Sequence, residues 1–207
     1  MARVMIATPT FDAGIKNATF ESVANLDWGE NDIQYKSITG YDCAGARTNI
    51  ADEAVKRGFD YVLMVDYDVV VPQDALNLLI EWDMPVMLGY YMHQGSFNPP
   101  YGNGKTCLCK PASYHDQYTS VELKELREAG KYKVPIRGGG MGCALIKVDV
   151  FKRIQYPYFK FMIYSNRNGV LSEDLYFCKQ CRDAGMTLYA DARVKCGHHF
   201  RHIEWPL

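Results

Sequence analysis

The chain has 207 residues, of which 48% are hydrophobic and 23% charged, the balance of an ordinary globular protein. Its 23 lysines and arginines are offset by 24 aspartates and glutamates, so no global positive charge exists to attract nucleic acid. The sequence shows neither a secretory signal nor the ~18 consecutive apolar residues of a membrane-spanning helix. We therefore expect a cytoplasmic protein without a transmembrane segment, whose seven cysteines are reduced.

The first half of the chain alternates short apolar runs with helical patterns. We expect strands at 3–8, 33–38, 61–66 and 86–90, and helices at 18–26, 44–57 and 73–82. The run from Tyr61 to Asp66 is apolar up to the aspartate, as in a central strand buried on both faces. Strands that alternate with helices predict an α/β fold: a mainly parallel sheet with helices on both faces, in a single domain.

Residues 92–137 interrupt this rhythm with glycine, proline, tyrosine and many polar residues, apart from a short charged helix expected near 121–129. A long irregular segment inside a compact domain is usually functional. We therefore interpret it as a lid or an acceptor-binding segment. The apolar rhythm resumes at 143–148, and a helix at 173–184 leads to a last strand pair near 187–195.

Asp66-Tyr67-Asp68 follows directly after the predicted central strand. Ligands bind beyond the carboxyl ends of the strands in parallel sheets. Two carboxylates separated by one residue can both turn toward that crevice and coordinate a hard cation such as Mg²⁺ or Mn²⁺. The alternative is a turn or a helix-capping pair, for which aspartate is also favoured.

Two further clues lie near the end of the chain. Ser172-Glu173-Asp174 opens a predicted helix, and either carboxylate there could act as a general base. The same residues suit an N-cap and an acidic first turn, which is the structural alternative. Gly197-His198-His199 follows the last predicted strands, where a histidine could complete a metal site or simply be solvated.

These clues occur together, in the order found in a known family. From Gly45 to His198 the chain resembles the GT-A glycosyltransferases, in particular the family-2-like enzymes with a DxD motif. The segments that carry the resemblance are Gly45–Asn49, Tyr61–Asp68, Gly138–Ile146, Ser172–Phe177 and Gly197-His198. The resemblance implies a Rossmann-like GT-A fold and a hexosyltransferase type of activity. A sugar would pass from a nucleotide-diphosphate donor (a UDP-sugar favoured over a GDP-sugar) to a hydroxyl acceptor, with inversion favoured.

The resemblance also divides the single domain and assigns roles by position. Residues 1–91 would form the nucleotide-binding half, and residues 138–207 the acceptor and catalytic half. Mn²⁺ or Mg²⁺ would be held by Asp66, Asp68 and His198. The catalytic residues would be Asp174, as the base, and Glu173, which would contact acceptor hydroxyls. The donor-binding residues would be Thr8, Pro9, Thr10, Arg47, Asp66, Gly139 and Gly140.

Two other classes of protein remain open. Nucleotidyltransferases share a similar sheet and a carboxylate-bound cation, but they usually carry a glycine-rich phosphate loop after the first strand, where this chain has Thr8-Pro9-Thr10. A zinc-stabilised binding module is the alternative outside enzymology. Its ligands would come from Cys178-x-x-Cys181 and Cys196-x-His198.

Overall fold

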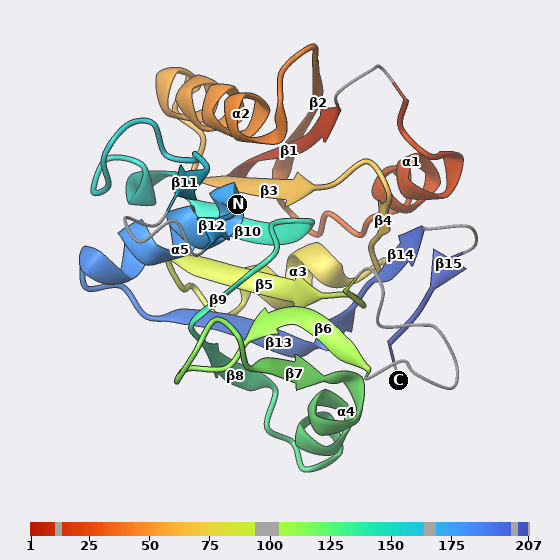
Figure 1. Ribbon diagram of the computed structural model, residues 1–207. Helices are drawn as coiled ribbons and strands as arrows, with labels where there is room; N and C mark the ends of the chain where they lie inside the picture. The colour runs from red at the N-terminus through yellow and green to blue at the C-terminus, as the bar shows by residue number, and fades with distance from the viewer. Residues whose placement is uncertain (11–13, 94–103, 164–168, 200–202, 207) are drawn as a thin grey trace.

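A seven-stranded sheet runs through the centre of the computed structural model, which describes residues 1–10, 14–93, 104–163, 169–199 and 203–206 (Figure 1). In spatial order the strands of this sheet are β2 (Asp32–Thr39), β1 (Arg3–Thr10), β3 (Tyr61–Val65), β10 (Cys143–Lys147), β5 (Val86–Tyr90), β13 (Leu188–Lys195) and β8 (Lys133–Ile136). Residues 62–65 of β3 are fully buried, which confirms its prediction as a central strand.

The sheet is mixed, so the prediction of a mainly parallel sheet holds only in part. Strand β1 pairs in parallel with β2 and β3, and β13 pairs in parallel with β5. Strand β10 lies antiparallel between β3 and β5, and β8 lies antiparallel to β13. Strands β1, β2, β3, β5 and β13 therefore share one direction. The apolar run of β10 correctly predicted a strand, but a buried run looks the same in either direction.

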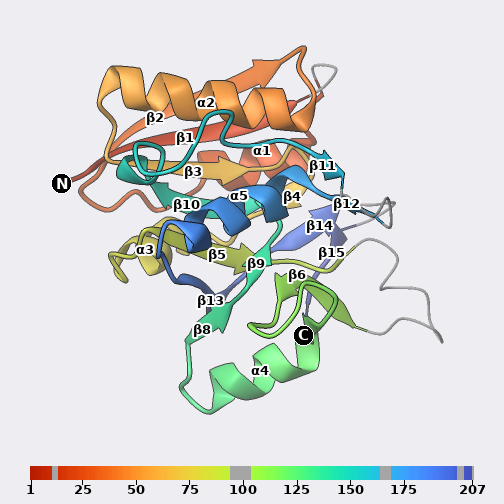
Figure 2. The same cartoon turned by 60° about the vertical axis from the view of Figure 1, so that its left-hand side comes forward.

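Helices lie on both sides of this sheet, with α5 in front of it and α3 behind it in Figure 1; Figure 2 shows the same arrangement after a turn of 60°. The helices are α1 (Asn17–Ala24), α2 (Cys43–Arg57), α3 (Ala75–Ile80), α4 (Ser120–Glu128) and α5 (Glu173–Asp183), with a 3-10 turn η1 (Val148–Val150). Each α-helix coincides with a predicted one to within a few residues. Helix α2 also contacts α5, so the two helices form one layer.

Three small sheets add to this core. One contains β7 (Gln117–Thr119), β6 (Lys105–Cys109) and β9 (Gly138–Gly139). The second contains β15 (Ile203–Glu204), β14 (Gly197–His199) and β4 (Val69–Val70). The third is the pair of β11 (Met162–Ile163) and β12 (Val170–Leu171).

Local signals explain the ends of α2, the helix that carries Arg47. The Asp42 carboxylate accepts a hydrogen bond from the Gly45 N–H at 2.7 Å, which satisfies one of the unpaired donors of the first turn. Gly58 ends the helix in the left-handed conformation (φ 67°), which glycine adopts without steric cost. Ile50 and Ala54 of α2 are fully buried and anchor the helix to the core.

Three details of the sequence-based prediction are wrong. The first strand, expected to end at residue 8, continues through Thr10, because Pro9 and Thr10 also pair with β2. The segment 92–137 contains β6, β7, α4 and β8, so its described part is largely regular; residues 94–103 of the predicted lid lie outside the described residues. The expected strand pair at 187–195 is the single strand β13. Within the described chain, no helix combines the length and the apolar character needed to cross a bilayer.

The close approach of the central strands depends on Gly89 in β5. A Cβ atom at Gly89 would lie 2.7 Å from Val194 Cγ1 on β13 and 2.8 Å from Cys143 Sγ on β10. We predict that Gly89→Ala lowers the free energy of unfolding by about 1–3 kcal/mol, the usual effect of overpacking a core. Urea denaturation measures it as a lower midpoint at constant m-value. Gly14→Ala is the control, because nothing lies within 4 Å of its Cβ position; equal midpoints would contradict the packing argument.

Candidate functional site

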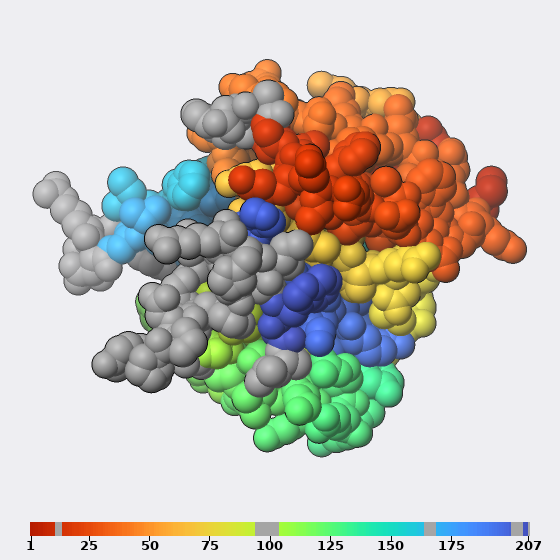
Figure 3. Space-filling model, turned by 90° about the vertical axis from the view of Figure 1, so that its right-hand side faces the viewer, coloured from red at the N-terminus to blue at the C-terminus, as the bar shows by residue number. Residues whose placement is uncertain are grey.

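Polar residues gather where β3 and β5 end, at the same edge of the sheet. Asp66 follows β3, and Tyr91 follows β5. The Asp66 N–H donates to the Gly142 carbonyl at 3.1 Å, which ties this edge to the start of β10. The C-terminal segment also comes here, because β14 pairs with β4 just after Asp68. Figure 3 shows the blue C-terminal segment on this side of the molecule, between the red N-terminal part and the green part that contains α4.

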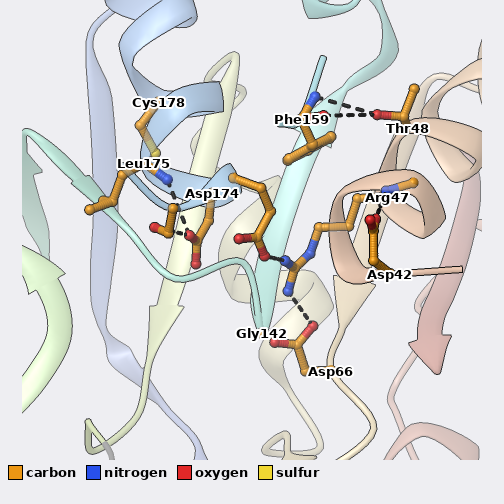
Figure 4. A network of polar contacts seen from close by, with 12 residues as sticks. Asp42, Arg47, Thr48, Asp66, Gly142, Phe159, Asp174, Leu175 and Cys178 are labelled. Atoms are coloured by element: carbon orange, nitrogen blue, oxygen red, sulfur yellow. Dashed lines mark hydrogen bonds and ion pairs between the residues drawn. The ribbon is translucent and has the colours of Figure 1, made fainter. Parts of the chain in front are cut away.

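Arg47 of α2 lies at the centre of the site and bridges two carboxylates (Figure 4). Its Nη2 donates to Asp66 Oδ1 at 2.7 Å, and its Nη1 donates to Glu173 Oε1 at the start of α5. The Arg47 side chain is 4% exposed. Its buried Nε has no hydrogen-bond partner among the described residues. The resemblance assigned Arg47 to donor contact, but the structure places its guanidinium below the surface, where it holds Asp66 and Glu173.

Burial and charge compete in setting the pKa values of this group. Burial by itself would lower the pKa of Arg47, but Asp66, Asp174 and Glu173 raise it above its ordinary value. Burial raises the pKa of Asp66 although Arg47 opposes the rise. The pKa of Glu173 is raised in the same way, by burial and then by Asp174. Burial is the main cause of both raised pKa values, and the neighbouring carboxylates add to it.

Asp68 and His198 form a second pair in the site. His198 Nε2 lies 3.6 Å from Asp68 Oδ2, and His198 Nδ1 lies 2.8 Å from the Met92 carbonyl oxygen. Burial would lower the pKa of His198, but Asp68 and the Met92 carbonyl raise it. The Tyr91 ring packs edge-on against the imidazole with the centroids 4.9 Å apart. A carbonyl that accepts from Nδ1 orients the ring with Nε2 toward Asp68, as in many metal-binding histidines.

These residues fit a divalent cation only as part of a wider coordination shell. Among the described residues there is no group of three or more histidine, cysteine or acidic side chains able to hold a metal ion. The predicted set is therefore not assembled, because Arg47 holds Asp66 while Asp68 faces His198. Mg²⁺ and similar ions are commonly held by one or two protein ligands together with water and substrate phosphates. Asp68 and His198 suit such a site.

A cavity of about 280 Å³ adjoins this pair and contains the predicted base. Asp174, Gly140 and His198 all line it. Glu173 does not, since it is 7% exposed and bonded to Arg47. Adjacent residues on a helix point about 100° apart, so the two carboxylates face different surroundings. Of the two, Asp174 is the one placed to meet a ligand.

The Asp174 carboxylate is also positioned by its neighbours, because Ser172 Oγ donates to its Oδ1 at 2.5 Å and the Leu175 N–H donates to the same oxygen at 3.2 Å (Figure 4). Tyr91, Cys107, Cys109 and Gln117 also line the cavity, although the predicted site included none of them. Position after a strand could have indicated Tyr91, and the spacing Cys107-x-Cys109 could have indicated the two cysteines. No local signal marks Gln117.

Packing of neighbouring side chains explains the glycines in the predicted Gly138–Ile146 segment. A Cβ atom at Gly140 would collide with the Tyr91 hydroxyl, and one at Gly142 would lie 2.8 Å from it. The Gly142 N–H donates to this hydroxyl at 3.2 Å. A Cβ at Gly139 would lie 2.8 Å from Leu88 Cδ1. The glycines therefore make room for neighbouring side chains, while Gly140 still lines the cavity.

Thr8 and Thr10, predicted to bind the donor, are buried and bonded within the sheet. The Tyr35 hydroxyl donates to Thr8 Oγ1 at 3.2 Å. Thr10 Oγ1 donates to the Ile38 carbonyl at 3.3 Å. Pro9 is buried between them. A donor contact by these side chains would require them to exchange partners on β2.

The cysteines proposed as zinc ligands are buried as hydrophobic side chains. Burial raises the pKa of Cys178 to about 12, and it also raises those of Cys181 and Cys196. The Cys178 thiol donates to the Gly139 carbonyl at 3.8 Å. A high pKa disfavours the thiolate that zinc requires. These thiols belong to no metal-binding group in the described part of the chain.

Comparison with protein-family models found no match, and comparison with curated proteins found none either. Among solved structures, 101 chains match. One is the crystal structure of A197 from STIV, with a TM-score of 0.65 and 18% identity over 96% of this chain and 86% of that one. At this identity the likeness concerns the fold alone. It supports a mixed α/β architecture in a single domain.

The buried bridge predicts a pH-dependent loss of stability in Arg47→Met. Removing one partner of a buried ion pair leaves charge uncompensated, so we expect a loss of about 3–5 kcal/mol at pH 7. Without Arg47, the already raised pKa values of Asp66 and Glu173 rise further. Stability from a raised carboxyl pKa is complete at low pH and is lost as pH rises above the ordinary value of about 4. The deficit should therefore shrink toward pH 4.

Chemical denaturation between pH 4 and pH 8 measures this difference. Arg57→Met is the control, because Arg57 pairs with Glu53 at 3.1 Å on the surface, where such pairs are worth about 0–1 kcal/mol. Adding Asp66→Asn and Glu173→Gln to Arg47→Met should restore part of the loss. A deficit that does not change with pH would mean that lost packing, rather than charge, explains the effect.

Proposed function

We propose that this protein is a metal-dependent glycosyltransferase that moves a sugar from a nucleotide-diphosphate donor to a hydroxyl acceptor. The observation that carries the proposal is the placement of Asp174 and His198 in the same cavity, with Asp68 beside His198. This puts a candidate base and a candidate metal pair within reach of one small ligand. A UDP-sugar is the favoured donor, with a GDP-sugar as the alternative.

The charge distribution supports a cationic group at this edge. Asp66, Asp68, Glu173 and Asp174 bring four carboxylates together, and each contributes to the electrostatics of Arg47 or of His198. Arg47 offsets only part of this charge and is itself buried. A divalent cation held by Asp68 and His198 would neutralise the donor diphosphate as it leaves. The carboxylates would otherwise repel the donor.

In the proposed reaction the acceptor hydroxyl lies against Asp174, which takes its proton. The acceptor oxygen forms a bond to the anomeric carbon of the sugar as the bond from that carbon to the phosphate oxygen breaks. The nucleoside diphosphate leaves with the bonding electrons. Ser172 and the Leu175 N–H keep the Asp174 carboxylate in position. Attack from the side opposite the leaving group gives inversion, provided that the base acts directly.

Metal-dependent donor binding tests the first half of the proposal. Calorimetric titration with UDP and GDP should show binding with Mn²⁺ and little binding with chelator. Asp68→Asn should abolish the metal-dependent part, because it removes one of the two proposed ligands. Asp32→Asn is the control, since Asp32 is an exposed carboxylate at the first residue of the edge strand β2. Equal affinity in Mn²⁺ and in chelator would refute the metal site.

Substitution of the proposed base, Asp174, tests the second half of the proposal. Asp174→Asn should slow release of nucleoside diphosphate from UDP- and GDP-sugars by ~10²–10⁴-fold, the usual contribution of a positioned general base. Donor affinity should change little. Glu173→Gln is the matched comparison, because it lowers stability through Arg47 while the base remains. Full activity in Asp174→Asn would move the base elsewhere. Release of pyrophosphate instead of nucleoside diphosphate would indicate a nucleotidyltransferase.

A further inference from the structure

Two arginines pack against the ring of Tyr114, a residue that lines the cavity. The guanidinium carbon of Arg137 lies 4.9 Å from the centroid of the Tyr114 ring, and that of Arg182 lies 5.0 Å from it. Arg182 Nη1 also donates to the Arg137 carbonyl, and Arg137 Nη1 donates to the Pro111 carbonyl at 3.3 Å. The two cations are therefore held by the backbone and by the aromatic ring, in a fixed arrangement. We call Arg137, Tyr114 and Arg182 the arginine–tyrosine stack.

The stack adjoins the proposed catalytic residue. Tyr114 lines the same cavity as Asp174, and its hydroxyl donates to the carbonyl of Leu175 at 3.4 Å. Charges of both signs affect the pKa of Cys109, another lining residue. Burial raises its pKa to about 11, Asp174 adds to the rise, and Arg137 and Arg182 oppose it. Asp174 and Tyr114 therefore line the cavity themselves, while Arg137 and Arg182 lie against the ring of Tyr114.

The positive charge of the stack has no acidic partner in the described part of the chain. Neither Arg137 nor Arg182 forms an ion pair there. Arg193 offers a comparison within the same protein. It also packs on aromatic rings, at 4.9 Å from the centroid of Tyr132, but it pairs with Asp191 at 2.6 Å. Two guanidinium groups that pack on the same ring, without a carboxylate partner among the described residues, are suited to an anionic oxygen group from a ligand.

We propose that the acceptor deprotonated by Asp174 carries an anionic group, a phosphate or a carboxylate, which binds to Arg137 and Arg182. This inference rests on the proposed function for its use of Asp174 as a base. The acceptor would span the cavity with its hydroxyl at Asp174 and its anionic end at the stack. The donor diphosphate would bind at Asp68 and His198 rather than at the stack, so the two anionic groups would not compete.

Direct binding measurements test the stack without donor or metal. The probes are glycerol 3-phosphate, glycerate and glycerol, which share a three-carbon hydroxyl skeleton and end in a phosphate, a carboxylate or a neutral hydroxyl. Calorimetry on the full chain should show binding of at least one anionic probe and about tenfold weaker binding of glycerol. Arg137→Gln and Arg182→Gln should each weaken the anionic probe by about tenfold. Arg153→Gln is the control, because among the described residues the Arg153 side chain bonds to a backbone carbonyl, that of Ala184, and lines no part of the cavity.

The binding results distinguish a charge-dependent ligand site from a defect in folding. Equal affinity for glycerol and both anions, or unchanged anion binding in Arg137→Gln and Arg182→Gln, would overturn the inference. Arg137→Lys and Arg182→Lys keep the charge and should retain more affinity than the glutamine variants, which separates charge from folding defects. Mn²⁺-dependent UDP or GDP binding, measured in the same variants, should not change. Anion binding without any metal-dependent nucleotide binding would leave the stack as a ligand site but remove the proposed transferase.

Discussion

The buried ion pairs of Arg47 fix the relative positions of two helices and the end of one strand, which lie in separate parts of the sequence. Arg47 comes from α2, Asp66 from the end of β3 and Glu173 from the start of α5. Burying a guanidinium is unfavourable unless carboxylates compensate it, so the three groups must stay together. With Glu173 held, the next residue of the helix, Asp174, is directed into the cavity. With Asp66 held, the turn that presents Asp68 is fixed as well.

A different interaction positions the other half of the site. The His199 N–H donates to the Asp68 carbonyl at 2.8 Å, and His198 pairs with Val69 across β4 and β14. Main-chain bonds thus bring His198 beside Asp68, and the Met92 carbonyl orients its ring. The main-chain bonds do not depend on the protonation of any side chain. The proposed metal pair is consequently positioned mainly by the backbone, whereas the proposed base is positioned by buried charge.

The sequence predicted the parts of this arrangement that have local causes. The buried run of β3, the capped helix α2 and the acidic start of α5 can each be recognised within a short window. The partners of Arg47 cannot, because 126 residues separate it from Glu173. The sequence also predicted too early an end for β1, because Thr8 and Thr10 form their side-chain hydrogen bonds with residues of β2 rather than with sequence neighbours. Cys109 and Tyr114 reach the cavity only because β6 pairs with β9.

The two ways of positioning have different consequences for how the site responds to change. Charge-based positioning at Glu173 and Arg47 weakens when the carboxyl groups gain protons, and their pKa values are already raised toward that state. Backbone pairing at β4 and β14 does not weaken in this way. Mild acid should therefore loosen the Asp174 side of the cavity before the His198 side. The cavity therefore lies between Asp174, whose position depends on titratable partners, and His198, whose position depends mainly on backbone pairing.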